Sequence, residues 1–241
     1  FTCGSNFTFG TALTQKTIFT INAPTLNLAS RVFTGNATKA QFNIANGVNV
    51  LTSNTGGLGV TGATGNFVGF SSIGNTPADG RVVFGANSNY TFTGSTITPF
   101  PVGGTWTTPN NIVIGGNITI NYTTPFSLNG TLTINNARTL RLNATSGANL
   151  NLIAPMIVNG TFDINGTSNQ VINAGGSASI VVNGTFITRD PEGFMGVNAS
   201  VPTLVPTLGS SSIVNYAGAS QVVTDSPYNN LTISGTGTKT L

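Results

Sequence analysis

The sequence has very little charge, no histidine and a single cysteine. Of its 241 residues, 8 are Lys or Arg and 5 are Asp or Glu, which is 5% of the chain against about 25% in an ordinary soluble domain. Without histidine the Ser-His-Asp and Cys-His arrangements are excluded, and without Cys or His clusters a zinc site is excluded. Cys3 alone forms no internal disulfide, so we expect an intermolecular bond, a free thiol or an inert apolar residue. We therefore expect no cofactor and no metal.

Long hydrophobic runs and clusters of positive charge are missing as well. No run of about 18 apolar residues occurs, so the sequence predicts no membrane span. The basic residues are scattered, whereas nucleic-acid binding needs clustered cations that displace counterions, so we expect no nucleic-acid partner. The opening "FTCGSNFTFG" has neither a basic start nor an apolar core, which is expected of a mature N-terminus after removal of a signal peptide or of an internal start.

What the sequence does have is Gly, Asn, Thr and Ser throughout, with short alternating apolar segments between them. "TLNL", "ITI", "LRL" and "LNL" are examples. Alternation with a period of two, bounded by Gly, Asn and Pro, is the strand signature, and Asn, Thr and Gly disfavour helix. The apolar residues are numerous enough for a buried core, so the sequence predicts a folded all-β protein and not a disordered chain.

Two regions differ in texture. Residues 1–110 are irregular, and residues 111–241 are regular. Between them lies "ITPFPVGGTWTTPNN", which is rich in proline. We expect residues 1–110 to continue the fold of the second region or to form a separate β-sandwich.

One phrase recurs in the regular region. "LNGTLTINN" starts at Leu128, "VNGTFDING" at Val158 and "VNGTFITRD" at Val182, with a looser copy around Gly116. In each copy the apolar residues and the central Gly share parity, so in an extended strand they share a face. Asn-Gly also favours a hairpin, but a two-residue loop would split the apolar residues between two faces. We therefore favour a continuous or bent strand with an inward Gly that allows close backbone approach.

The spacing of the phrase indicates a solenoid. The glycines at 130, 160 and 184 lie at intervals that fit one coil each, and two further strand candidates lie between successive copies. Three strands per coil predict a parallel β-helix, a β-solenoid, over at least residues 111–241. Leu132, Phe162 and Phe186 should then align inside. The predicted stacked core is Leu132, Ile134, Phe162, Ile164 and Phe186, and the predicted amide ladder is Asn129, Asn159 and Asn183.

The acidic residues are the only candidates for catalysis. Polysaccharide cleavage needs paired carboxylates, or a carboxylate with a base. Asp163 is expected on the outward face of its strand, where a surface ion pair with Arg138 or Arg141 explains it. Asp190 and Glu192 lie in "RDPEG", which is a turn phrase, although oxygen ligands there would also suit calcium. We expect no enzyme.

The C-terminal segment "SSIVNYAGASQVVTDSPYNNLTISGTGTKTL" carries a family resemblance. Its "VNY", "QVV" and "YNNLTISGTGTKTL" pieces resemble the repeats of secreted surface proteins of Bacteroidota, the β-strand-repeat or adhesin-like group. "GGNITI" and the NGT phrases are similar to segments of the same group, so the resemblance covers roughly residues 111–241. It implies a bacterial, exported, non-enzymatic protein that serves attachment, surface coats or filaments.

Together these observations predict an extracellular or cell-surface structural subunit. A solenoid has open strand edges, and the final "LTISGTGTKTL" contains only Lys239 as a charged residue. We expect self-assembly, head to tail, through an edge formed by Leu231, Thr232, Ile233 and Leu241. The alternative is an adhesin or stalk module that binds surface glycans through exposed aromatics such as Tyr90, Trp106, Tyr122 and Tyr228. A polysaccharide-cleaving enzyme is the third hypothesis.

Overall fold

All regular structure in the described part of the chain is β-strand. The computed structural model describes residues 1–9, 14–59, 65–74, 76–94, 96–97, 109–122, 125–144, 149–166, 171–173 and 176–241. Among these residues, none belongs to a helix long and apolar enough to cross a membrane. The chain forms two compact units, Phe1–Ile118 and Thr119–Leu241. The fold is a parallel β-solenoid, as the sequence predicted.

Unit 1 consists of short strands in three parallel arrays. The first array has the order β12-β10-β6-β3, the second β2-β5-β9-β8 and the third β1-β4-β7. Parallel pairing in three arrays is the arrangement of a solenoid and not of an antiparallel β-sandwich. The strands are β1 (Phe7–Thr8), β2 (Thr17–Ile21), β3 (Thr25–Ala29), β4 (Phe33–Thr34), β5 (Ala40–Ile44), β6 (Asn49–Thr52), β7 (Phe67–Val68), β8 (Ser72–Gly74), β9 (Arg81–Phe84), β10 (Ser88–Phe92), β11 (Thr96–Ile97) and β12 (Pro109–Ile114).

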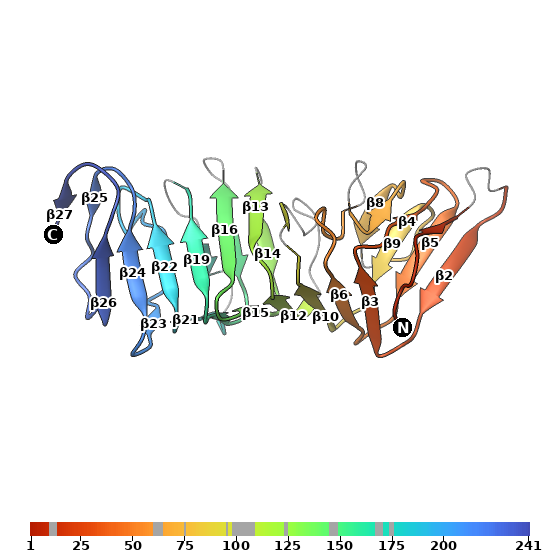
Figure 1. Ribbon diagram of the computed structural model, residues 1–241, viewed down its shortest axis with the longest axis horizontal. Coiled ribbons are helices and arrows are strands. Elements are labelled where there is room, and N and C mark those ends of the chain that lie inside the picture. Colours follow the sequence, from red (N-terminus) through yellow and green to blue (C-terminus); the bar gives the residue numbers. More distant parts are fainter. Residues whose placement is uncertain are drawn as a thin grey trace. The chain divides into compact units, whose positions relative to one another are not determined.

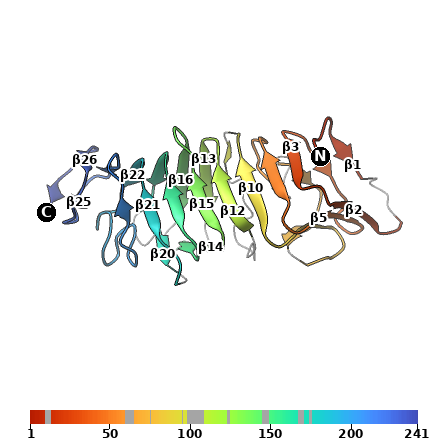
Figure 2. The ribbon, with the colours of Figure 1, turned by 90° about the horizontal axis from the view of Figure 1, so that it is seen from below.

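Unit 2 repeats a three-strand coil, and its strands lie side by side in Figures 1 and 2. We name its faces by their strand order: the first face is β15-β18-β21-β23, the second β13-β16-β19-β22-β24-β26 and the third β14-β17-β20. The pair β25-β27 follows. The strands are β13 (Ile118–Tyr122), β14 (Phe126–Leu128), β15 (Thr131–Ile134), β16 (Thr139–Ala144), β17 (Leu150–Leu152), β18 (Met156–Val158), β19 (Thr161–Ile164), β20 (Val171–Asn173), β21 (Ile180–Val182), β22 (Thr185–Thr188), β23 (Thr207–Leu208), β24 (Ile213–Tyr216), β25 (Gln221–Val222), β26 (Asn230–Ile233) and β27 (Lys239–Thr240).

The core of unit 2 forms because inward positions of successive coils align. Phe162 lies beside Leu140 on one side and Phe186 on the other, and the rings of Phe162 and Phe186 are 5.3 Å apart. The side chains expected in the core are all fully buried: Leu132, Ile134, Phe162, Ile164 and Phe186. Their neighbours in sequence, mostly Thr and Asn, face outward, as strand alternation requires.

The Asn-Gly phrases at 159–160 and 183–184 are bends between two strands. β18 and β19 flank Asn159-Gly160, and each of them pairs in parallel with the next coil. Val158 and Phe162 are both buried, as a bend with an inward glycine requires. A Cβ on Gly184 would overlap the carbonyl oxygen of Gly160. The prediction of a bent strand with close backbone approach is therefore confirmed, and the hairpin is excluded at these two positions.

The copy of the phrase at Gly130 lies at a different corner of the coil. Gly130 separates β14 from β15 and thus joins the third face to the first, whereas Gly160 and Gly184 join the first face to the second. Leu132 consequently lies beside Met156. The expected alignment of Leu132 with Phe162 is wrong, because the 30-residue interval between the two phrases spans more than one coil. The coil length here is 24 residues, as from Met156 to Ile180.

Unit 1 owes its core to phenylalanine. Phe42 contacts Phe19, Phe33 and Phe67 at ring-centroid distances between 5.0 and 5.3 Å. Phe7 and Phe9 extend this cluster to the first strand, with their rings 5.0 Å apart. Aromatic pairs at such distances contribute beyond their buried area, which compensates for strands of only two to five residues.

Candidate functional site

The strand β26 presents core positions to solvent. Leu231 lies beside Val214, and Ile233 lies beside Tyr216. Val214 and Tyr216 are fully buried, yet Leu231 is 43% exposed and Ile233 50% exposed. Since residues in register along a parallel sheet share a face, the two exposed side chains occupy inward positions that lack the next coil. The predicted edge residues Leu231 and Ile233 thus form an open end of the core.

The other two predicted edge residues are exposed as well. Thr232 lies between Leu231 and Ile233 on β26 and points the opposite way, beside Asn215. Leu241 is fully exposed and follows β27. β26 is the last strand in the order of its face, so its outer edge pairs with no strand of the described chain. We call Leu231, Thr232, Ile233 and Leu241 the open edge.

Few charged groups protect the open edge. β26 itself contains only Asn, Leu, Thr and Ile. The ammonium of Lys239 donates hydrogen bonds to the carbonyls of Gly218 (2.8 Å) and Ala219 (2.5 Å). Natural sheet edges are commonly blocked by charged side chains, bulges or covering segments. The described part of β26 shows an apolar alternation without such a charge.

The remaining large exposed apolar residues fall into two groups. Phe1, Phe7 and Ile18 lie on or near β1 and β2 in unit 1. Val197, Val205 and Val222 lie in the segment after β22 or on β25. β2 is itself an outer strand of its array. The apolar exposure therefore concentrates on edge strands and on one loop.

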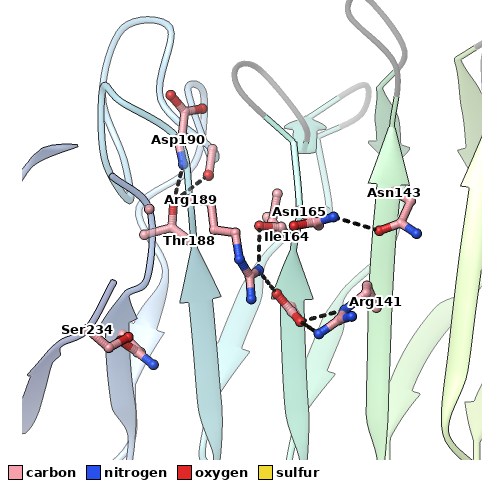
Figure 3. Close-up of polar contacts among 12 residues, drawn as sticks. Arg141, Asn143, Ile164, Asn165, Thr188, Arg189, Asp190 and Ser234 are labelled. Carbon is pink, nitrogen blue, oxygen red and sulfur yellow. Dashed lines mark hydrogen bonds and ion pairs between the residues drawn. The ribbon is translucent and has the colours of Figure 1, made fainter. Parts of the chain in front are cut away.

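Amide ladders run along the solenoid, but with different members than the sequence predicted. Asn183 donates to Asn159 at 2.9 Å, as expected. Asn129 does not belong to this ladder, because Ile134 pairs with Val158 and the register therefore places Asn135 next to Asn159. A second ladder, not foreseen, runs from Asn165 to Asn143 (3.0 Å) and from Asn143 to Asn121 (2.8 Å); Figure 3 shows its Asn165–Asn143 step.

Asp163 is the centre of an ion cluster on the second face (Figure 3). Arg141 donates to one carboxylate oxygen through Nε at 2.7 Å and Nη2 at 2.6 Å. Arg189 binds the other oxygen. Arg141 is the partner from the neighbouring coil that the sequence proposed; Arg138 is exposed and makes no ion pair given for the described residues. Asp163 is 1% exposed, so the two arginines cover it. A carboxylate held on both oxygens is poorly placed to act as a general acid or base.

Asp190 lies in a buried polar cluster that the sequence did not predict. The turn 189–193 follows β22, and the side chains of Thr188, Asp190, Ser200 and Gln221 are all at most 3% exposed. Thr188 Oγ1 lies 2.8 Å from Ser200 Oγ. Burial raises the pKa of Asp190 to about 7, opposed by the hydrogen bond from the Glu192 amide and assisted by the Glu192 charge. No pattern in the sequence marks this cluster, because its members are brought together by an irregular segment.

Two tyrosines close a ring of hydrogen bonds beside β24. The Thr224 amide donates to Tyr216 Oη at 3.0 Å, and the Tyr228 hydroxyl donates to the Thr224 carbonyl at 2.7 Å. The two hydroxyl oxygens are 2.6 Å apart, and the Tyr216 proton is the one left to bridge them. Burial, and then the bond with Tyr216, raises the pKa of Tyr228. These are the tyrosines of the "VNY" and "YNN" pieces.

The proposed aromatic platform for glycans does not form from the tyrosines whose side chains are described. Tyr90 is 1% exposed, and Tyr228 is half-buried and engaged in the hydrogen-bond ring. Trp106 and the side chain of Tyr122 lie outside the described residues. The expectation of an outer face carrying Tyr90 and Tyr228 as binding groups is therefore wrong.

Metal-ligating residues do not gather anywhere in the described ranges. No group of three or more Cys, Asp or Glu side chains lies close enough to hold an ion there. Cys3 is buried and free, and burial raises the pKa of its thiol. Its sulfur is consequently a poor nucleophile at neutral pH.

The comparisons with known proteins add no name. No family model, no curated protein and no solved structure matches the chain. The resemblance to Bacteroidota surface repeats therefore rests on the quoted residues alone, and the structure establishes a parallel β-solenoid.

Proposed function

We propose that the protein is a structural subunit of an extracellular filament, sheath or surface coat, and that its subunits assemble head to tail through complementary β-edges. The observation that carries this proposal is the open edge. Leu231 and Ile233 occupy core positions, continue the register of buried residues and remain about half exposed. A row of unpaired backbone groups beside such side chains is a template for another strand.

Burial supplies the driving force for this assembly. Apolar area removed from water contributes roughly 25 cal/mol per Å², and each new coil also satisfies the backbone groups along the edge. All pairings given for the solenoid are parallel, so a copy that continues them adds in the same orientation. Identical head-to-tail contacts that do not close produce an open filament.

The surface chemistry and the resemblance agree with an extracellular structural role. With 5% charged residues, long-range repulsion between copies is weak. The amide ladders stabilise the faces without charge, as Asn ladders do in other stacked β-structures. The resemblance of residues 111–241 to secreted Bacteroidota surface repeats supports export to the cell surface.

The glycan-binding alternative has less support. Tyr90 and Tyr228, two of the four aromatics on which it depended, are buried or hydrogen-bonded. The enzymatic alternative loses its main candidate, since both oxygens of Asp163 are engaged by arginines.

The test is self-association of the 241-residue chain, and of a variant with both Leu231→Lys and Ile233→Lys. The two lysines place like charges on the edge, so we expect the wild type to form elongated polymers and the variant to sediment as a monomer. Analytical ultracentrifugation over a concentration series and negative-stain microscopy measure the difference.

A matched control carries Val197→Lys and Val205→Lys. These valines are 85% and 84% exposed, so the control adds the same charge to the loop after β22 and should assemble like the wild type. A wild type that stays monomeric at the highest concentration, or a loop variant that dissociates as fully as the edge variant, contradicts the proposal.

A further inference from the structure

The side chain of Asp190 is enclosed without a charged partner. It is fully buried, and its Oδ1 accepts one hydrogen bond, from the Glu192 amide at 3.0 Å. Its Oδ2 has no hydrogen-bond partner among the described residues. Figure 3 shows Asp190 beside Thr188, whose Oγ1 accepts from the Asp190 amide at 3.2 Å. A buried carboxylate with one bond is costly when ionised, and the neutral acid is the form this environment favours.

The same turn holds the terminal coil, by which we mean β25, β26 and β27. Gln221, the first residue of β25, donates through Nε2 to the carbonyls of Asp190 (2.9 Å) and Thr188 (3.3 Å). The Val222 amide donates to the Pro191 carbonyl at 2.7 Å. Gln221 Oε1 in turn accepts from the Gly218 amide at 2.7 Å. Four hydrogen bonds thus connect the terminal coil and the turn through one side chain and one amide.

The charged and titratable groups around Asp190 do not neutralise it. Within the turn, Glu192 is negative and Arg189 is bound to Asp163. β22 contains only Thr, Phe and Ile, and β25 only Gln and Val. From β24, Tyr216 approaches the turn near Gly193, and from β27 Lys239 is bound to the Gly218 and Ala219 carbonyls. The segment 193–201 carries no charged residue.

We infer that the 189–193 turn is an acid-stabilised clasp: with the Asp190 carboxyl neutral it holds β25 in place, and when that carboxyl ionises the turn opens and loosens the terminal coil. The clasp would regulate the open edge, since β26 belongs to the same coil. This last consequence rests on the proposed function, whereas the opening of the turn does not.

The direction of the pH dependence follows from linkage. The pKa of Asp190 is about 7 in the folded turn and takes its ordinary value, 3.8, when the turn opens. The contribution of the neutral acid to stability is therefore fully present below pH 4, decreases as the pH rises and is lost above pH 7. Opening should increase about tenfold per pH unit between these limits and then level off.

Amide hydrogen exchange on dilute, monomeric protein tests the clasp between pH 4 and pH 8. After correction for intrinsic exchange, we expect the protection of the amides of Gly193, Gln221 and Val222 to fall about tenfold per unit up to pH 7. In Asp190→Asn the protection should be independent of pH. Asp225→Asn, the same change at an exposed residue of unit 2, should keep the wild-type profile.

A measurement on the unmodified protein makes the test independent of any variant. The ¹³C shift of the Asp190 carboxyl should titrate near pH 7. Titration below pH 5, or equal exchange profiles for the wild type and Asp190→Asn, overturns the clasp. Polymer yield is scored separately: loss of assembly at every pH with an intact exchange profile refutes the proposed function and leaves the clasp standing.

Discussion

Inward glycines at the corners set how closely successive coils approach. At Gly184 a side chain would meet the carbonyl oxygen of Gly160 and the backbone of Asn159. Backbone atoms cannot move aside as a flexible side chain can, so only a residue without a Cβ fits. The parity of the repeated phrase predicted that these glycines point inward. It did not predict what they touch, because that depends on which corner lies beneath.

This contact gives a prediction at a single residue. Gly184→Ala should destabilise the protein by about 1–3 kcal/mol, as overpacking does. Gly176→Ala is the matched control, because a Cβ there meets nothing within 4 Å, and it should change the free energy of unfolding by less than about 0.5 kcal/mol. Denaturant unfolding followed by circular dichroism measures both; equal effects of the two substitutions would contradict the packing described for Gly184.

At the scale of the element, the hydrogen-bond ring of Tyr216, Thr224 and Tyr228 fixes the segment between β25 and β26. Tyr228→Phe removes the donor to the Thr224 carbonyl and the acceptor for Tyr216. We expect a loss of about 1–2 kcal/mol, with a smaller additional loss when Tyr216→Phe is combined with it, since both belong to one network. A double-mutant cycle of unfolding free energies measures the coupling, and strictly additive effects would show that the ring does not act as a unit.

The strands were predictable from alternation, but their phase around the coil was not. "LNGTLTI" and "VNGTFDI" have the same local pattern, and each forms strand, bend and strand. They lie at different corners because any corner between two strands with inward apolar residues accepts Asn-Gly. The sequence therefore supports the stacking of Phe162 with Phe186 and misplaces Leu132 and Asn129.

The irregular texture of residues 1–110 hid a solenoid for a physical reason. Its strands are two to five residues long, apart from β12 with six, so alternation has little length in which to show. Ring contacts among residues distant in sequence, such as Phe9 with Phe70 at 5.9 Å, supply the core. A search for repeats does not detect such contacts, because they have no fixed spacing.

For the whole molecule, the candidate site was predictable only in part. The apolar alternation of Leu231 and Ile233 indicated the open edge directly. The clasp was not predictable, because Asp190 and Gln221 are 31 residues apart and meet through an irregular segment. Hydrogen bonds between a side chain and a distant backbone carbonyl leave no pattern in the sequence.

The corner geometry permits a test that spans the solenoid. Duplicating the 24 residues 159–182 in tandem joins Val182 to a second Asn159, which repeats the existing bend. It also leaves Arg141 and Arg189 each beside one aspartate, so no buried charge is stranded. We expect a folded protein with a single cooperative unfolding transition and more strand signal in circular dichroism.

The control duplicates the 30 residues 129–158, which the repeated phrase alone would suggest as the unit. That insertion adds four strands, shifts every later strand by one face and should destroy cooperative unfolding. If the 24-residue insertion unfolds the protein, or if both insertions fold equally well, the coil assignment is wrong.

The matching bends after β18 and β21 have a consequence for how such a chain changes in length. Wherever two corners are interchangeable, a stretch of gene between them can be copied or lost by recombination without a new turn having to arise. A lineage that carries this architecture can thus adjust the reach of its product in steps of one layer, and the 24-residue step is the increment we expect between its variants.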